Sequence, residues 1–318
     1  MDKPEIPKDL GFGTGASSKE QKLINNNGSF NVNRIGQSFF ESFHIYHYLI
    51  NQTWRNFIFL VLLFYTVANF IFAILYLLAG IENLAGVEGN TFFEKFYDAI
   101  FFSAQTLTTV GYGRISPVGF STNLIAAIES LFGVISFALL TGICFGKFSR
   151  PSAKILFSKN IVVAPYKNAN ALMFRLVNAR KNQFIESEIQ VVLALNALKD
   201  GERKRVFYRL NLEIEKINFF PLPWTVVHPV DEKSPLNNMQ IKEFEEGNPE
   251  ISIMFKSFDD TFHQNVYARF SYIFEDIVWG KKFEIAHRPS ESGQIELDLN
   301  KFNNLVDFKL NKGSFYRD

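Results

Sequence analysis

The stretch TTVGYG at residues 108–113 lies between two long apolar segments, and the rest of the chain is interpreted from it. An uncharged loop at membrane depth leaves backbone N–H and C=O groups unpaired in hydrocarbon, and it is tolerated where it lines an aqueous path. Successive carbonyls face one side only if alternate residues adopt a left-handed backbone, which costs little at Gly111 and Gly113. The alternative is a surface turn that happens to hold two glycines. The flanking segments favour the first interpretation.

Those flanking segments predict two membrane spans. Residues 57–80 carry no charge and are long enough to cross a hydrocarbon core about 30 Å thick. Trp54 and Tyr76 lie near the ends of this segment, as interfacial aromatic residues do. Residues 123–146 form a second apolar segment that is interrupted only by Glu129. We therefore predict transmembrane helices over about 57–80 and 123–146.

Glu129 is a candidate functional residue because an ionisable group within a span is expensive and faces protein or water. Two interpretations are open. In the first, the carboxyl group acts in function. In the second, it is hydrogen-bonded to a neighbouring element and is purely structural.

The linker at residues 81–121 holds the loop and predicts a short helix before it. Thr91 is suited to cap a helix over about 92–107, and Glu94 falls in its first turn, where the helix dipole favours a negative charge. Such a helix would direct its negative C-terminal end towards the loop and favour a cation there. Helix and loop together form a re-entrant element at 92–113.

Charged residues around the spans predict the topology. Lys147, Arg150 and Lys154 follow the second span, whereas residues 80–121 hold four acidic residues and two basic ones. The positive-inside rule therefore places both termini in the cytoplasm. The transmembrane pore domain is expected to cover residues 54–150.

Two segments precede the first span. Residues 1–36 are polar, lack an apolar signal segment and predict a mobile or partner-docked cytoplasmic arm. In residues 37–53, aromatic and polar residues mix at spacings of one, three and four. This pattern predicts an amphipathic helix, and its place before a span favours a helix that lies in the headgroup plane over an ordinary soluble one.

From about residue 155 the pattern changes to an alternation of period two, which is typical of half-buried strands. The alternating stretches are 208–215, 251–255, 266–274 and 295–299. Prolines are spaced too closely for long helices, and one short helix is expected at 239–246. Strands without βαβ spacing predict an antiparallel, immunoglobulin-like β-sandwich over residues 151–318.

Composition excludes several classes of function. The net charge of +1 gives no electrostatic reason for a nucleic-acid partner. The single cysteine, Cys144, excludes an intrachain disulfide and a multi-cysteine metal site. The five histidines show no metalloprotease spacing, and no nucleophile-elbow or phosphate-loop motif occurs. We therefore expect neither an enzyme nor a cofactor.

The motifs resemble those of the prokaryotic inward-rectifier potassium channels, the KirBac family, along nearly the whole chain. The matching stretches are LINNNGSFNV at 23–32, FFSAQTLTTVGYG at 101–113, TGICFGKFSRPSAKILFS at 141–158, LMFRLVNARKNQ at 172–183, VVHPVDEKSPL at 226–236 and VYARFSYIFEDIVWG at 266–280. The TVGYG signature is shared by potassium channels in general, where four such loops replace the hydration shell of K⁺. The later stretches are specific to inward rectifiers.

The resemblance implies a homotetramer in the cell (inner) membrane, with a single pore for K⁺ on its four-fold axis. It implies a selectivity filter of Thr109, Val110, Gly111, Tyr112 and Gly113, with support from Gln105, Thr108, Arg114 and Glu129. It also implies a hydrophobic gate at Phe145, contacts with anionic lipid or phosphoinositide at Lys147, Arg150 and Lys154, and a cytoplasmic pore lined by Glu186, Glu188 and Phe258. The last of these belongs to a loop at 257–264 that narrows the cytoplasmic pore.

The sequence departs from the family pattern at several positions. Gln105 replaces a pore-helix glutamate that braces the filter in many relatives, and Arg114 follows the filter directly. We hypothesise that Glu129 compensates electrostatically, in which case Glu129→Gln should weaken K⁺ selectivity or filter stability. Phe137 occupies the cavity position where strongly rectifying relatives have an acid, so weak block by Mg²⁺ or polyamines is expected. Ser257 and His263 stand where animal relatives have glycines.

A K⁺ channel is the leading hypothesis. The alternative is a non-conducting, membrane-anchored β-sandwich that senses a ligand or partner. That alternative explains the β domain but leaves an intact filter between the two spans without a role.

Overall fold

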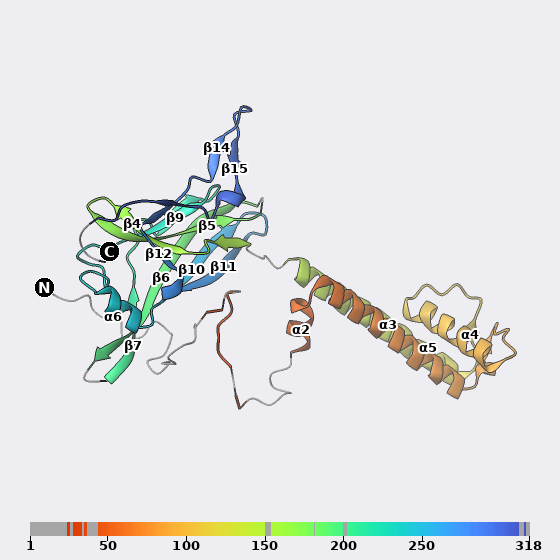
Figure 1. Cartoon of the computed structure of the whole chain (residues 1–318). Helices are drawn as coiled ribbons and strands as arrows, with labels where there is room; N and C mark the ends of the chain where they lie inside the picture. The colour runs from red at the N-terminus through yellow and green to blue at the C-terminus, as the bar shows by residue number, and fades with distance from the viewer. Residues whose placement is uncertain are drawn as a thin grey trace. The chain divides into compact units, whose positions relative to one another are not determined.

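A computed structural model shows the chain as two compact units (Figure 1). One comprises Ile35–Arg150 and is called the helical unit; the other comprises Met1–Arg34 with Pro151–Asp318 and is called the β unit. The structure describes residues 24–25, 28–33, 35–36, 44–149, 154–180, 182–199, 202–311 and 315, with the backbone alone for 198–199 and 202–203.

Two helices of the helical unit are long and apolar enough to cross a membrane, α3 (Trp54–Leu78) and α5 (Phe120–Phe148). At 1.5 Å per residue, even the shorter one reaches about 37 Å, which exceeds a hydrocarbon core of about 30 Å. Both expected spans are therefore present. The first begins earlier than expected because the Thr53 hydroxyl accepts a hydrogen bond from the Asn56 N–H and caps the helix.

Between these two helices lies α4 (Phe92–Leu107), over the range expected from the sequence. Thr91 and Glu94 form a capping box in which each side chain accepts a hydrogen bond from the other residue's N–H. Figure 1 shows α4 beside one end of α3 and α5. This cap defines where the re-entrant helix starts.

A short two-stranded pairing closes the linker around α4. β1 (Leu84–Ala85) pairs antiparallel with β2 (Ser116–Pro117), next to a 3₁₀ turn at Ile81–Asn83. Gly86 has φ +86° and lies so close to Arg114 that a Cβ atom would meet the Arg114 carbonyl oxygen at 1.9 Å. Only glycine fits this approach, which brings the two ends of the linker together.

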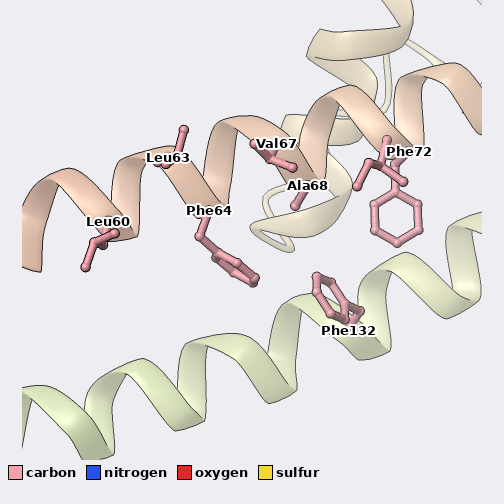
Figure 2. A pocket seen from close by; sticks show the side chains of 8 residues that line it. Leu60, Leu63, Phe64, Val67, Ala68, Phe72 and Phe132 are labelled. Atoms are coloured by element: carbon pink, nitrogen blue, oxygen red, sulfur yellow. The ribbon is translucent and has the colours of Figure 1, made fainter. Parts of the chain in front are cut away.

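Aromatic rings bridge α3 and α5 across an apolar groove (Figure 2). Phe64 points from α3 towards α5, and Phe132 points from α5 towards α3, with ring centroids 5.9 Å apart. Phe72 lies at the same distance from Phe132 on the other side. The remaining lining residues are Leu60, Leu63, Val67, Ala68 and Ile71.

The helix expected at residues 37–53 is shorter in the described part of the chain. α2 covers Ile45–Asn51, and residues 37–43 lie outside the described residues. Gln52 and Thr53 have extended backbones and separate α2 from α3. The amphipathic segment and the first span are therefore two distinct helices.

The β unit has two five-stranded sheets. In the first, the long strand β6 (Phe184–Lys199) is bordered on one side by β10 (Glu250–Asp259) and on the other by β7 (Glu202–Arg209) and β8 (Lys216–Phe219). β11 (Gln264–Ile273) pairs with the free side of β10.

In the second sheet, β5 (Ala169–Asn178) takes the central place. It pairs with β9 (Trp224–Pro229) on one side and with β3 (Ile155–Phe157) and β4 (Ile161–Tyr166) on the other. β12 (Ile277–Trp279) pairs parallel with β4, a departure from the purely antiparallel prediction, since alternation does not encode strand direction. The remaining strands form the hairpin-like pairs β13 (Lys281–Phe283) with β16 (Leu305–Asp307) and β14 (His287–Pro289) with β15 (Ile295–Leu297).

Side chains from both sheets make one hydrophobic core. Leu172, Leu176 and Val226 contribute from the second sheet, and Leu193 and Phe255 from the first, all at most 2% exposed. Two sheets that share a core form a β-sandwich. The predicted sandwich is therefore present.

Three expected elements have different limits. The stretch 208–215 is not a strand beyond Arg209. The Leu210 N–H donates to Val191 of the first sheet, the Glu213 N–H donates to Val227 of the second, and the Glu215 carbonyl accepts from Ile189 of the first, so this segment reaches the second sheet and returns to the first. The strand expected at 295–299 stops at Leu297.

After Leu297, the Asp298 carboxylate caps a 3₁₀ turn at Leu299–Lys301. The strand expected at 266–274 likewise ends at Ile273, before a 3₁₀ turn at Phe274–Asp276. The short helix expected at 239–246 is α6 (Ile241–Glu246).

Most of the expected N-terminal arm lies outside the described residues, but part of it is docked on the β unit. The Ile24 N–H donates to the Glu250 carboxylate at 3.3 Å, and the Ser271 hydroxyl donates to the Ile24 carbonyl at 3.0 Å. Ile24 is 3% exposed. Further along, the Arg269 guanidinium lies 5.1 Å from the Phe30 ring centroid.

His228 is a buried, fully hydrogen-bonded histidine of β9. Its Nδ1–H donates to the Asn211 carbonyl at 2.7 Å, and its Nε2 accepts from the Ser234 hydroxyl at 2.8 Å. Both bonds form with a neutral ring. Burial lowers the pKa of His228 below its ordinary value, although the hydrogen bond to Asn211 and the charge of Asp231 oppose this.

The lowered pKa of His228 predicts acid destabilisation of the β unit. The unfolded chain binds a proton at His228 near pH 6.5, whereas the folded chain does so only at lower pH. Stability is therefore fully present above pH 6.5 and is lost as pH falls through the folded pKa. The melting temperature of the full-length protein should fall from pH 7 to pH 5 less steeply in His228→Gln than in wild type. The exposed His287→Gln should keep the wild-type slope, and equal slopes for all three proteins would contradict the assignment.

Candidate functional site

The loop after α4 has an alternating backbone. Thr109, Gly111 and Gly113 have φ of +61°, +53° and +79°, with Val110 and Tyr112 between them. This alternation is the geometry in which successive carbonyls point to one side. The sequence suggested it for the two glycines; the structure adds Thr109, a non-glycine residue with a left-handed backbone.

The end of α4 anchors the loop through main-chain hydrogen bonds. The Gln105 carbonyl accepts from the Val110 N–H at 2.9 Å and from the Gly111 N–H at 3.3 Å. The Thr109 N–H donates to the Thr106 carbonyl at 3.0 Å, and the Thr108 hydroxyl donates to the Ala104 carbonyl at 2.7 Å. Gln105 thus contacts the loop by its backbone carbonyl, and the Thr108 hydroxyl contacts the last turn of α4.

Beyond the loop, Arg114 forms an ion pair that the sequence did not indicate. Its guanidinium lies 3.1 Å from the Asp98 carboxylate. The second oxygen of Asp98 accepts hydrogen bonds from the N–H groups of Glu88 and Gly89, both at 3.3 Å. Asp98 therefore joins the two sides of the linker, and nothing in the local pattern of an aromatic-rich helix could have identified it.

Glu129 of α5 is completely buried against α3 and α4. Its carboxyl group contacts the Tyr76 hydroxyl of α3 at 2.6 Å and the Ser103 hydroxyl of α4 at 2.5 Å. Ser103 is in turn 3.1 Å from the Asn69 side-chain oxygen of α3. These four residues are called the carboxyl cluster below. Sequence analysis singled out Glu129 as a functional candidate, whereas Ser103 and Asn69 are ordinary residues of apolar helices. Tyr76 was expected to be an interfacial aromatic residue; that expectation is wrong, because its side chain is buried and its hydroxyl donates to Glu129.

One turn further along α5, Gly133 lets the helix approach the end of α4. A Cβ atom at Gly133 would lie 2.0 Å from the carbonyl oxygen of Leu107, the last residue of α4. The helices therefore meet directly below the base of the loop.

Phe137 and Phe145, the expected cavity and gate residues, are among several exposed aromatic residues of α5, together with Phe120 and Phe148. Phe137 is 75% exposed and Phe145 is 72% exposed. The Phe137 carbonyl accepts a hydrogen bond from the Thr141 hydroxyl one turn later. Exposed apolar side chains on a helix long enough to cross a membrane can face lipid or another protein surface.

Near the end of α5, Lys147 contacts the main chain of α2. Its ammonium group donates to the Ile50 carbonyl at 3.0 Å and to the Gln52 carbonyl. It also lies 5.2 Å from the Trp54 ring centroid. A cation at these carbonyls complements the negative end of α2. Of the other two residues expected to bind lipid, Lys154 is exposed and Arg150 lies outside the described residues.

The acidic residues expected in the cytoplasmic pore lie on β6. Ser187 and Ile189 are buried, so Glu186 and Glu188 lie on the opposite, outward side. Glu186 has φ +51° at a bulge against β10 and lies 3.9 Å from the Lys216 ammonium. The Glu188 carboxylate accepts a hydrogen bond from the Gln190 amide at 3.1 Å.

The loop expected at 257–264 is mostly a β-hairpin. β10 continues to Asp259 and β11 starts at Gln264, so the turn covers only 260–263. The Ser257 hydroxyl donates to the Ile185 carbonyl at 2.9 Å, which fastens the strand to β6. Phe258 makes an edge contact with His263, whose φ is +51°.

A re-entrant helix followed by an alternating, glycine-containing loop between two membrane-spanning helices defines the class of potassium-selective pores. Residues 57–150 match the family model described as "Ion channel", and residues 155–317 match "Inward rectifier potassium channel C-terminal domain". The second match covers half of the chain, and the chain belongs to the inward-rectifier potassium channel family.

Individual relatives agree. The chain is 33% identical over 295 residues to "Inward rectifier potassium channel Kirbac3.1" of Paramagnetospirillum magnetotacticum, covering 91% of this chain and 97% of the relative. It is 24% identical to "ATP-sensitive inward rectifier potassium channel 12" of Gallus gallus, covering 93% and 75%. It is 29% identical to "Inward rectifier potassium channel 4" of Homo sapiens, covering 59% and 45%. The protein is a membrane protein of this channel family, and K⁺ is its permeant ion.

The contact between Gly133 and Leu107 predicts a strong effect of one methyl group. Gly133→Ala should displace the end of α4, destabilise the protein by about 1–3 kcal/mol as overpacking does, and lower K⁺ flux at least several-fold. The matched control is Gly142→Ala on the same helix, where the described chain has no atom within 4 Å of the new Cβ. It should keep both flux and melting temperature. A wild-type melting temperature and flux in Gly133→Ala would contradict this packing.

Proposed function

We propose that four copies of this chain form a homotetramer that conducts K⁺ passively and in single file through Thr109, Val110, Gly111, Tyr112 and Gly113. The observation that carries the proposal is the left-handed backbone at alternate residues, anchored on the Gln105 carbonyl. Four such loops around one axis would surround a dehydrated ion with carbonyl oxygens. Weak binding at several sites permits the ion to leave. The chain needs no catalysis or cofactor for this.

The proposed topology follows the charges at the ends of the spans. Both termini lie in the cytoplasm, so the protein is a multi-pass protein of the cell (inner) membrane. The domains are the arm at 1–36, the interfacial helix at 37–53, the transmembrane pore domain at 54–150 and the cytoplasmic domain at 151–318.

The pathway below the filter is formed by α5 in this proposal. Phe137 lines the cavity and four copies of Phe145 close a hydrophobic gate, in accord with the high exposure of both side chains in one chain. A hydrophobic constriction gates by excluding water. Because Phe137 carries no charge, Mg²⁺ and polyamines should block the pore only weakly. Glu186, Glu188 and Phe258 line the cytoplasmic entrance.

Gating is proposed to involve membrane lipid and the α2–α5 contact. Lys154 and Arg150 would attract anionic headgroups, at about 1 kcal/mol for each basic residue near the surface. Lys147 was expected to do the same. Its ammonium already has the Ile50 and Gln52 carbonyls as partners, so a headgroup there would have to replace one of them. We assign Lys147 first to holding α2 on α5.

Flux measurements test the channel function. Purified protein in liposomes should take up radioactive rubidium when driven by a K⁺ gradient, with inhibition by barium and no uptake driven by Na⁺. Added phosphoinositide gives the sign of lipid regulation. Gly111→Ala is the control, because a Cβ at φ +53° costs about 1–2 kcal/mol of backbone energy while the described part of the chain has no atom within 4 Å of it. It should fold and lose at least tenfold in uptake. Wild-type uptake that is insensitive to barium and equal for Na⁺ would exclude a K⁺-selective pore.

The role of Lys147 is tested by hydrogen exchange in α2. Hydrogen bonds to a charged donor are worth about 1.5–3 kcal/mol, so Lys147→Met should speed amide exchange in Ile45–Asn51 by roughly 10- to 100-fold. Lys154→Met is the matched control and should leave exchange in α2 unchanged while weakening binding to vesicles with anionic lipid. If Lys147→Met weakens lipid binding and leaves α2 exchange unchanged, Lys147 is a lipid ligand instead.

A further inference from the structure

The carboxyl cluster joins α3, α4 and α5. Three polar contacts link its four side chains, whereas the hydroxyl groups of Tyr76 and Ser103 supply only two protons for them. Tyr76 and Glu129 are both 0% exposed, as is Ser103, and Asn69 is 3% exposed. α3 supplies Asn69 and Tyr76, α4 supplies Ser103, and α5 supplies Glu129. All of the polar groups are therefore shielded from water and have to satisfy one another.

The Ser103 hydroxyl is the critical group. Its Oγ lies 2.5 Å from one Glu129 oxygen and 3.1 Å from the Asn69 side-chain oxygen. A serine has a single hydroxyl proton to donate. If Glu129 were ionised, both neighbours of Ser103 would be acceptors, and one of the two contacts would have no proton.

Reversing the Asn69 amide does not remove the conflict. The Asn69 amide nitrogen donates to the Tyr65 carbonyl, one turn earlier in α3, at 2.7 Å. After a reversal, the amide oxygen would face that carbonyl oxygen at the same distance, with two acceptors in contact. The Tyr65 carbonyl thus fixes the side-chain oxygen of Asn69 towards Ser103.

With a proton on Glu129, each of the three contacts in the cluster has one donor and one acceptor. The carboxylic O–H donates to Ser103 Oγ, the Ser103 hydroxyl donates to the Asn69 oxygen, and the Tyr76 hydroxyl donates to the other carboxyl oxygen at 2.6 Å. Each group then has a partner of the right kind.

The electrostatic surroundings favour the same species. Within the described residues, no cationic side chain forms an ion pair with Glu129, and a buried carboxylate without a counter-charge is costly. Tyr76 is the titratable side chain that touches it, from α3, and α4 presents an uncharged serine. One turn away on α5, Gly133 touches the Leu107 carbonyl at the negative end of α4, which also disfavours an anion.

We propose that Glu129 is a proton-binding site: the neutral carboxylic acid, held by Tyr76, Ser103 and Asn69, is the species that braces α4 against α3 and α5. Glu129 then acts as a positioning residue for the filter through α4. This inference rests on the proposed function for the role of α4, but the protonation itself does not depend on conduction. It opposes the hypothesis that the side chain supplies a compensating negative charge.

The two interpretations predict opposite results for one substitution. In Glu129→Gln, the amide nitrogen can donate to Ser103 and the amide oxygen can accept from Tyr76, so a neutral brace is preserved. A compensating charge would be lost. In Glu129→Asp the carboxyl group is one methylene shorter and cannot reach both hydroxyls, although it retains the chemistry of an acid.

Infrared spectroscopy and flux on the full-length protein in liposomes test the proposal. Wild type at neutral pH should show the C=O stretch of a protonated carboxyl group, and Glu129→Gln should lack it. The control Glu88→Gln, at an exposed position of the linker, should keep the band. Rubidium uptake and K⁺ over Na⁺ selectivity should stay within about twofold of wild type in Glu129→Gln and fall at least tenfold in Glu129→Asp.

Absence of the protonated-carboxyl band from wild type would overturn the proposal, even if Glu129→Gln fails to fold. So would a folded Glu129→Gln that loses K⁺ selectivity. Failure of the proposed channel function has a different signature, because it would remove rubidium uptake from wild type and leave the infrared band in place.

Discussion

The main-chain groups of residues 108–113 have to find hydrogen-bond partners at membrane depth, and the helical unit is built around this constraint. α4 ends just before the loop and offers the Gln105 carbonyl to two successive N–H groups. The remaining carbonyls are left free to point one way because Thr109, Gly111 and Gly113 alternate in a left-handed backbone. Irregular backbone is tolerated in a membrane only with such support. The capping box at Thr91 and the close contact at Gly133 fix both ends of that support.

The helices are held together by small and polar residues because lipid gives apolar side chains little reason to leave it. Most of the apolar surface of α3 and α5 stays exposed in the single chain, and burial is concentrated where α4 meets them. The carboxyl cluster and Gly133 lie in this region. The β unit follows the other rule, since it buries a continuous apolar core between two sheets. The helical unit is therefore stabilised by the packing of small and polar residues, and the β unit by the burial of apolar side chains away from water.

Lys147 illustrates how one side chain can connect conduction with the membrane surface. Its position after a span predicts lipid contact, whereas its two carbonyl partners place it between α2 and the end of α5. Phe145, the proposed gate residue, is two positions away in the same helical turn. In the proposed function, movement of α2 would therefore act on the helix that carries Phe145.

The sequence by itself determined both spans, α4 with its cap, the filter loop, the β-sandwich class and the family, because these depend on local hydrophobicity, capping and motifs within a few residues. It could not show that 210–215 reaches the second sheet and returns to the first, or that β12 runs parallel to β4, since alternation carries neither direction nor partner. It singled out Glu129 but not Tyr76, Ser103 and Asn69. These come from helices far apart in the sequence, and only the tertiary structure brings one hydroxyl between two acceptors. The match between hydrogen-bond donors and acceptors in the carboxyl cluster therefore depends on all four side chains and cannot be read from any one of them.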